Sequence, residues 1–405
     1  MQHSLRFAFY LSAILLLVAC GTPQPLESIR DRISNIEAQY PAVAVWYTDG
    51  SNAFEAECRE YQNASAFHYC TVNQPYIVGD WLSEQLEGSY QFQYVAPYEE
   101  GYDYQLHLTT ANYSNETAGD FAEALISGSS LLLIPMKETY LQKSEIAVVW
   151  RDVELGRFNY EFPVESSIGL FSDTTAAHKY AGTELAVAFL NDIANTDIFD
   201  AEYLYKELGA SDYPADLQYP EAIGDFYYED MAVLPDPLYG TLVRYIHSTF
   251  SFDYIDTFIY PVRSAEWSNP EEALDSELDN FYAEMETAAE SDEADVQNMA
   301  LQEAESIIWP TNNGEIVGRR VIGSINIENG DIYDTYMYLF NQGDKFIKFR
   351  ASFLRSENPP PNIEADLQIA LNEFVVPDES EYMAQLRQRV RNLNPQESSS
   401  ETGKK

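Results

Sequence analysis

Cys58 and Cys70 are the residues whose type and spacing most directly suggest chemistry in this sequence. The segments around them have the composition of β-strands, and residues 62–65 have that of a turn. A three-residue loop between the strands would place position 58 opposite position 70, where β-carbons lie about 4.5–5.5 Å apart. The pair lacks the Cys-x-x-Cys spacing typical of reactive thiols. The sequence therefore predicts a disulfide-bonded hairpin, formed in an oxidising compartment.

A third cysteine, Cys20, follows the apolar run 7–19. A helix that spans a bilayer needs about 20 apolar residues, so this shorter run predicts an export signal rather than a membrane span. Leu17-Val18-Ala19-Cys20 closely resembles the lipobox of bacterial lipoproteins. The resemblance implies a signal peptide at 1–19, cleavage before Cys20, and a lipid on Cys20 that anchors the chain to a membrane. The alternative is an ordinary signal peptide that happens to contain a cysteine.

The residue after Cys20 carries a further implication of this resemblance. In bacterial lipoproteins, Asp at that position tends to retain the protein in the inner membrane, and here the position is Gly21. The resemblance thus implies an outer-membrane anchor, with the protein facing the periplasm. Lipid on Cys20 also leaves Cys58 and Cys70 as an even pair.

A group of basic residues near the end of the chain is a second candidate site: Lys345, Lys348, Arg350 and Arg355. They alternate with their neighbours along a predicted strand, so their side chains would point outward from it. The group suggests a docking or anion-binding face. The alternative is that its charges neutralise nearby carboxylates or protect an edge strand.

Aromatic residues form a third group, made of Phe226-Tyr227-Tyr228 together with Met231 and Tyr239. Such side chains can dock a partner or stack on a sugar. The alternative is that they pack the two domains together.

Signatures of catalysis and of metal binding are missing from the sequence. The five His residues never occur at His-x-x-x-His spacing, and no Gly-x-Ser-x-Gly elbow, Walker phosphate loop or Gly-x-Gly-x-x-Gly turn is present. The acidic segments 292–295 and 329–334 contain oxygen ligands for calcium, but neither matches an EF-hand loop, and both are interpreted as solvated charge. We therefore predict no catalytic residue, no cofactor and no metal site.

The charge balance excludes one class of partner. The chain has 23 basic and 66 acidic residues, a net charge of −43, and loss of Arg6 with the signal peptide gives 22 − 66 = −44. Nucleic-acid phosphates are bound by clustered Lys and Arg, so a nucleic-acid partner is not expected. Adaptation of an exported protein to salty surroundings explains this charge most simply, although binding of a cation or polycation is an alternative.

The order of expected elements predicts an α+β fold, with two α+β domains whose sheets are largely antiparallel. Removal of the signal peptide leaves 405 − 19 = 386 residues, enough for two domains of about 150 each. The expected parts are an anchor and spacer at 20–40, an α+β domain with the disulfide hairpin at 41–195, a connector rich in Tyr, Asp and Pro at 196–237, a second α+β domain at 238–378, and a helical end with a disordered tail at 379–405.

Each domain has a weak resemblance to known envelope proteins. In the first, a helix before two strands, the turn Leu131-Leu132-Leu133-Ile134-Pro135 and a closing helix at 174–193 are similar to TolB-type and CsgG-type amino-terminal domains. In the second, an amphipathic helix from Pro270 precedes strands at 315–327, 334–340 and 345–353. This helix, followed by a hairpin that contains Lys-Phe-Ile-Lys-Phe-Arg, resembles PsbP and DcrB. Neither resemblance supplies a functional residue.

The anchor and the absence of catalytic motifs together predict a non-catalytic, lipid-anchored protein of the cell envelope. It would act as a binding or scaffold component, with an envelope protein as its partner. The alternative is a lipid-anchored periplasmic hydrolase that acts on envelope polysaccharide or peptide through a pair of carboxylates.

Overall fold

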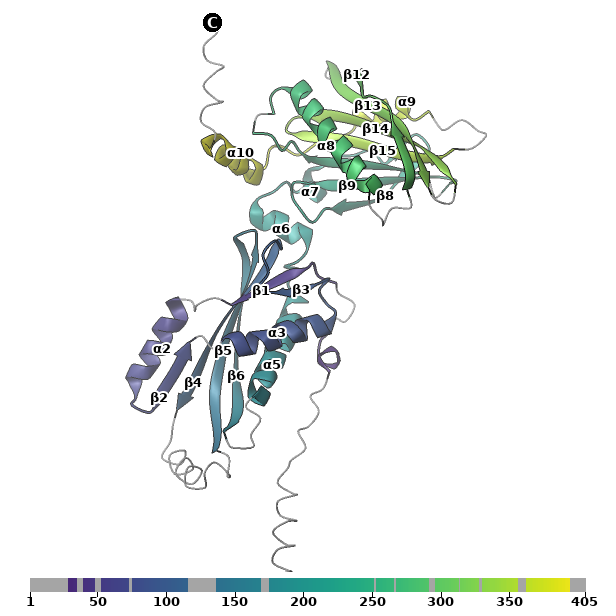
Figure 1. The fold of residues 1–405 in the computed structure, drawn as a ribbon. Coiled ribbons are helices and arrows are strands. Elements are labelled where there is room, and N and C mark those ends of the chain that lie inside the picture. The colour runs from purple at the N-terminus through teal and green to yellow at the C-terminus, as the bar shows by residue number, and fades with distance from the viewer. Residues whose placement is uncertain are drawn as a thin grey trace, which may run out of the picture. The chain divides into compact units, whose positions relative to one another are not determined.

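The chain folds into two compact units, Met1–Asp197 and Ile198–Lys405. Each combines helices with a mostly antiparallel sheet, so the fold class is α+β, as the sequence predicts (Figure 1). The signal peptide, Cys20 and the turn at 131–135 lie outside the residues that the structure describes. This structure, a computed structural model, describes residues 28–34, 39–47, 52–72, 75–115, 136–168, 175–250, 253–265, 267–290, 296–312, 314–327, 330–355 and 362–393.

A six-stranded sheet forms the centre of the first unit. Its strands are β1 (Val43–Tyr47), β2 (His68–Val72), β3 (Val95–Pro97), β4 (Tyr104–Asn115), β5 (Met136–Trp150) and β6 (Val153–Ile168). Strand β4 pairs with β1 and β2 along one edge and with β5 along the other. β5 and β6 form a hairpin in which Arg151 and Asp152 have φ of 42° and 71°. Positive φ at both central residues is the mark of a type I′ turn, whose twist matches that of the strands.

Helices cover both faces of this sheet. On one face, α3 (Pro75–Ser89) packs against α5 (Thr175–Ile193), which is the closing helix predicted at 174–193. The two helices approach closely at Gly182, where an added β-carbon would lie 2.5 Å from the β-carbon of Trp81. On the other face, α2 (Asn52–Ala64) packs against β2 and β4 (Figure 1).

Helix α2 corrects the prediction of a disulfide hairpin. The segment around Cys58 is helical through Ala64, so no turn is present at 62–65. Phe54, Cys58 and Tyr61 lie four and three residues apart, which places them on one face of a helix, and all three belong to the core against the sheet. The same residues had suggested a strand because a short segment with few apolar positions fits both periods. The disulfide therefore joins a helix to a strand.

The second unit is built on a nine-stranded sheet in the order β11-β13-β14-β15-β10-β9-β8-β7, with β12 also paired to β13. All of its strand pairs are antiparallel. The strands are β7 (Ala222–Ile223), β8 (Phe226–Val233), β9 (Thr241–His247), β10 (Tyr254–Pro261), β11 (Val296–Leu301), β12 (Glu305–Thr311), β13 (Gly314–Ile327), β14 (Ile332–Gln342) and β15 (Lys345–Leu354).

Two hydrophobic cores lie on opposite faces of this sheet. On one face, the apolar stripe of α8 (Pro270–Glu290), which includes Leu274 and Phe281, packs against Tyr260 and Phe346. On the other face, α6 (Ala201–Leu208), α7 (Tyr213–Asp216) and α9 (Glu364–Leu371) contribute side chains to a second core. Strand β15 alternates as predicted, with Ile347, Phe349, Ala351 and Phe353 on one face, but its other face is covered by α8.

The connector predicted at 196–237 is instead part of the second unit. It contains α6, α7, β7 and β8, and its aromatic residues Tyr205, Tyr213 and Phe226 are buried in the core. The Tyr205 hydroxyl donates to the carbonyl oxygens of Asp236 and Gly240, at 3.0 and 2.9 Å. The Tyr, Asp and Pro composition resembled that of a linker, but these rings supply packing area, and the Tyr205 hydroxyl bonds to the segment between β8 and β9.

The final described element is α10 (Glu381–Leu393), in the region predicted as a helical end. The tail beyond it, from residue 394, lies outside the described residues. Among the helices in the described ranges, none is both long and apolar enough to cross a membrane.

Candidate functional site

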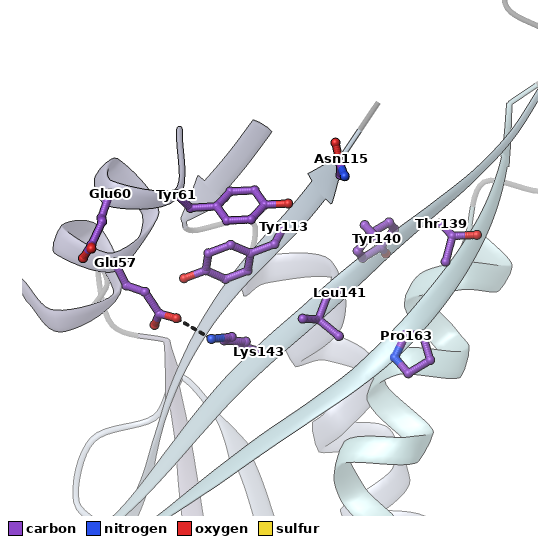
Figure 2. Close-up of a pocket in the computed structure, with 10 residues that line it drawn as sticks. All are labelled: Glu57, Glu60, Tyr61, Tyr113, Asn115, Thr139, Tyr140, Leu141, Lys143 and Pro163. Atoms are coloured by element: carbon purple, nitrogen blue, oxygen red, sulfur yellow. Dashed lines mark hydrogen bonds and ion pairs between the residues drawn. The ribbon is translucent and has the colours of Figure 1, made fainter. Parts of the chain in front are cut away.

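A cavity of about 580 Å³ lies between α2 and the sheet of the first unit (Figure 2). Its floor follows the strand register, because Tyr113 on β4 is opposite Leu141 on β5, which is opposite Pro163 on β6. Its wall is the side of α2 that carries Glu57, Glu60 and Tyr61. A volume of this size is typical of sites that bind small ligands or side chains of a partner. We call this cavity the α2 groove.

The predicted disulfide is present and fixes the wall of the α2 groove. Cys58 on α2 is bonded to Cys70 on β2, with their Cα atoms 5.4 Å apart. Two hydrogen bonds support it: Gln62 Nε2 donates to the Cys70 carbonyl oxygen at 2.7 Å, and His68 Nδ1 donates to the Tyr61 carbonyl oxygen at 3.1 Å. The helix is thus held on the sheet by one covalent and two polar links next to Glu57 and Tyr61.

Aromatic rings form one side of the α2 groove. The Tyr61 ring stacks on His68, with centroids 4.3 Å apart and planes 11° from parallel. It also meets the Tyr113 ring edge to face at 5.2 Å, and its hydroxyl donates to the Ser114 carbonyl oxygen at 3.3 Å. These contacts restrain both tyrosine rings, which lie beside each other in Figure 2.

A lysine lies at the centre of the α2 groove. Lys143 on β5 forms an ion pair with Glu57, and its Nζ is 3.8 Å from the carboxylate of Glu161. Nζ also lies 5.0 Å from the centre of the Tyr113 ring, within the range of a cation–π interaction. The hydrogen bond to Glu57 raises the pKa of Lys143. Burial, followed by the charge of Glu57, raises the pKa of Tyr113 to about 12, so at neutral pH the lysine is charged and the phenol is neutral.

The electrostatic balance of the α2 groove is negative. Three carboxylates lie in or beside the groove, those of Glu57, Glu60 and Glu161, and the one charge of Lys143 offsets one of them. Glu60 is exposed, and among the residues that the structure describes it forms no ion pair. The groove can therefore attract a positive group to Glu60.

The basic residues predicted to share one face are not brought together. Lys345 is fully buried, and its Nζ lies 2.6 Å from Asp344 Oδ1. It lies on the same face of β15 as Ile347, which points into a core, so the expectation of an outward side chain was wrong. Arg355 is half exposed and pairs with Asp334. Only Lys348 and Arg350 remain together, beside α8, where they line a second cavity.

Lys345 belongs to a buried ionic cluster. Asp344 accepts from Lys345 and, through Oδ2, lies 3.1 Å from Arg387 Nη1 on α10. Arg387 also donates to the Val262 carbonyl oxygen at 2.6 Å and pairs with Glu379. Burial lowers the pKa of Lys345, and the hydrogen bond to Asp344 opposes this effect. The cluster ties α10 to the β14–β15 turn and is internal to the second unit.

The aromatic group predicted around residue 226 is also divided. Phe226 is buried in a core of the second unit, whereas Tyr227, Tyr228 and Tyr239 are exposed. Met231 is partly buried and packs against the same core, so only the three tyrosines of the group lie at the surface.

The two acidic segments that were considered as calcium sites are only partly described by the structure. Residues 292–295 lie outside the described residues, and Asp334 is engaged by Arg355. Across the described ranges, no three side chains of His, Cys, Asp or Glu are grouped so that they could hold a metal ion.

The α2 groove was not expected from the sequence. Its residues come from α2, β4, β5 and β6, and only the strand register brings them together. One local signal was present: if 52–64 had been recognised as a helix, Glu57, Glu60 and Tyr61 would have fallen on one side of it.

Comparison with known proteins gives no family for this chain. No family of known domains matches it, and no curated protein matches it. Among solved structures, one similar chain is cyanobacterial PsbP (CyanoP) from Synechocystis, which is 16% identical in sequence. The alignment covers 40% of this chain and 94% of CyanoP, with a TM-score of 0.28. Another is a Xanthomonas campestris protein from a family of unknown function, with 11% identity, 44% and 89% coverage, and a TM-score of 0.19. At such TM-scores neither likeness bears on function.

Proposed function

We propose that this chain is a non-catalytic, lipid-anchored binding component of the bacterial cell envelope. Cys20 carries the lipid, the outer membrane is the membrane it enters, and both folded units lie in the periplasm. The lipobox residues and Gly21 support the anchor, and the disulfide between Cys58 and Cys70 is of the kind formed in an oxidising compartment.

The α2 groove is the binding site in this proposal, and its occupant is a basic segment of an envelope protein. The observation that carries the proposal is the position of Lys143, which lies over the Tyr113 ring and between two carboxylates. The groove thus already holds one lysine from its own chain. Glu60, an exposed carboxylate that also lines the groove, can pair with a Lys or Arg from outside.

The charge of the whole chain favours the same kind of partner. A net charge of −43 attracts a basic segment over a distance of about one Debye length, roughly 8–10 Å at physiological salt. Complementary charge of this kind raises the rate of association and selects against acidic partners.

The ion pair between Glu57 and Lys143 favours a binding role for the groove over a hydrolytic one. Glycoside hydrolysis requires two carboxyl groups that flank the bond to be cleaved, one as acid and one as base or nucleophile. Glu57 and Glu60 extend from the same helix three residues apart, and Glu57 is held by Lys143. In this arrangement Glu57 positions a lysine.

Crosslinking in cells followed by pull-down tests the binding proposal. Glu60→Lys reverses a charge at the mouth of the α2 groove, and Glu99→Lys, at another exposed position of the same unit, is the matched control. We expect the wild type and the control to recover the same envelope protein, and Glu60→Lys to lose most of it. Equal recovery with all three chains would contradict the assignment of the groove.

The anchor is tested separately by changing Cys20 to Ala. The expected result is release of the protein from the membrane fraction into the periplasmic extract. An unchanged membrane fraction would refute lipid attachment at Cys20.

A further inference from the structure

The second unit contains a cavity of about 390 Å³ between α8 and the sheet. Its apolar part is formed by Phe258 on β10, Met337 on β14, and Phe281 and Met285 on α8. Its charged lining consists of three cations, Arg263, Lys348 and Arg350, and one carboxylate, Glu284. We call it the α8 cavity. Because all of its lining residues belong to the second unit, a role for this cavity does not depend on the α2 groove.

The strand register explains why cations gather here. Lys348 on β15 is opposite Phe258 on β10 and Leu339 on β14, and Arg350 is opposite Asp256 and Met337. Both basic side chains therefore extend from the face of the sheet that α8 covers. Arg263 follows the end of β10 and lies at the side of the same cavity.

Lys348 is the inner cation of the α8 cavity. Its Nζ lies 5.0 Å from the centre of the Tyr260 ring and 5.7 Å from that of Phe258, and 3.8 Å from Glu277 Oε1. Glu277 is itself buried and accepts a hydrogen bond from the Tyr260 hydroxyl at 2.6 Å. Burial lowers the pKa of Lys348, and the charge of Glu277 raises it. Lys348 is thus fixed within the unit.

The two arginines differ from Lys348 in their pairing, because Glu284, the carboxylate that lines the same cavity, forms no ion pair with either of them. Both are exposed, and among the described residues neither has an ion-pair partner within 4.0 Å. Arg263 is held over the Tyr239 ring, 4.9 Å from its centre. Asp256, the residue opposite Arg350, is bound by Arg244 through two hydrogen bonds of 2.7 and 3.0 Å. In a chain with 66 acidic and 23 basic residues, arginines would be expected to find carboxylate partners, yet these two form no ion pair within the described ranges.

We propose that the α8 cavity binds an anionic amphiphile, whose carboxylate or phosphate group pairs with Arg263 and Arg350 while its hydrocarbon part contacts Phe258, Phe281, Met285 and Met337. Guanidinium groups bind carboxylates and phosphates through paired hydrogen bonds. The volume is in the lower part of the range for small-molecule sites. A carboxylate would come from a free fatty acid and a phosphate monoester from a lipid headgroup.

Titration calorimetry with the full chain carrying Cys20→Ala tests this proposal, because that substitution removes the predicted lipid. The probes are dodecanoate, dodecyl phosphate, inorganic phosphate and uncharged dodecanol, each below its aggregation concentration. We expect dodecanoate or dodecyl phosphate to bind more tightly than both inorganic phosphate and dodecanol. Tighter binding of one of the two anionic amphiphiles identifies the source of the head group.

Charge variants connect the binding to the cavity. Arg263→Gln and Arg350→Gln should each weaken binding of the preferred amphiphile by about tenfold, which corresponds to loss of one charged hydrogen-bond donor group. Arg355→Gln, which removes an exposed arginine paired with Asp334, is the matched control and should not change binding. The proposal is overturned if neither amphiphile binds, if inorganic phosphate or dodecanol binds as tightly, or if the three variants bind equally well.

Discussion

Removal of the disulfide between Cys58 and Cys70 should loosen helix α2 and the groove beside it. The perturbation is the double substitution Cys58→Ser and Cys70→Ser. The bond closes a loop with a sequence separation of 12 residues. In the loop-entropy treatment, such a loop stabilises the folded state by about 3 kcal/mol, by reducing the freedom of the unfolded chain.

This loss should be confined to the first unit. For a domain of 150–250 residues, 1 kcal/mol corresponds to a change of about 2–4 °C in Tm, so the double variant should melt about 6–12 °C lower. Calorimetry resolves this transition, and the transition of the second unit provides an internal reference because that unit has no cysteine.

Hydrogen exchange shows where the stability is lost. Amides of α2, residues 52–64, should exchange faster in the double variant, whereas those of α5 should change less, because α5 lies on the other face of the sheet. Treatment of the wild type with a reductant should reproduce both effects. An unchanged Tm together with unchanged protection of α2 would refute the argument that the disulfide holds the wall of the groove.

Three further substitutions test other parts of the structure. Arg387→Ala should destabilise the second unit by about 3–5 kcal/mol in urea unfolding, because it removes a cation from the buried carboxylate of Asp344. Burial lowers the pKa of His178 in the folded protein, so as the pH falls below about 6.5 the unfolded chain binds a proton at His178 before the folded protein does. The free energy of unfolding should therefore decrease between pH 7.5 and 5.5, and His178→Gln should make its dependence on pH flatter. Gly182→Ala should destabilise the first unit by about 1–3 kcal/mol, because the new methyl group would overlap α3, whereas Gly88→Ala, where no atom lies within 4 Å, should not. No decrease with Arg387→Ala, an unchanged pH curve with His178→Gln, or equal effects of the two glycine changes would contradict the respective contacts.

Patterns with a clear period were sufficient to predict much of the second unit. Leu274, Leu278 and Phe281 recur at the spacing of one helical face, and α8 buries that face. Strand β15 shows strict alternation along its length, and the structure divides its side chains between two cores accordingly. Such patterns are informative because the period itself determines which residues share a face.

Composition was a poorer guide where burial depends on distant partners. Residues 196–237 have the composition of a linker, yet Tyr213 and Phe226 are buried by strands and helices far along the chain. Lys345 was expected at the surface, and its burial is compensated by the carboxylate of Asp344 and by the carbonyl oxygen of Asp378. In both cases the burial depends on strands and helices that come from other parts of the chain.

The disulfide was predicted correctly from an incorrect local structure. The number of cysteines and the short separation between Cys58 and Cys70 favoured a bond whether the first cysteine lay on a strand or on a helix. The α2 groove depends on that distinction, since only a helix places Glu57, Glu60 and Tyr61 along one wall. A correct covalent prediction was therefore not enough to predict the site.

The central proposal is that the α2 groove binds a basic segment of an envelope protein. Site-specific photocrosslinking in intact cells is the most direct test of it. A photoreactive residue is placed at position 60, at the mouth of the groove, and in a second strain at position 99, and the crosslinked protein is identified with its attachment site. We predict one dominant envelope protein from position 60 and none from position 99, with attachment in a segment rich in Lys and Arg. Crosslinking that is equal from the two positions, or attachment within an acidic or uncharged segment, would contradict it.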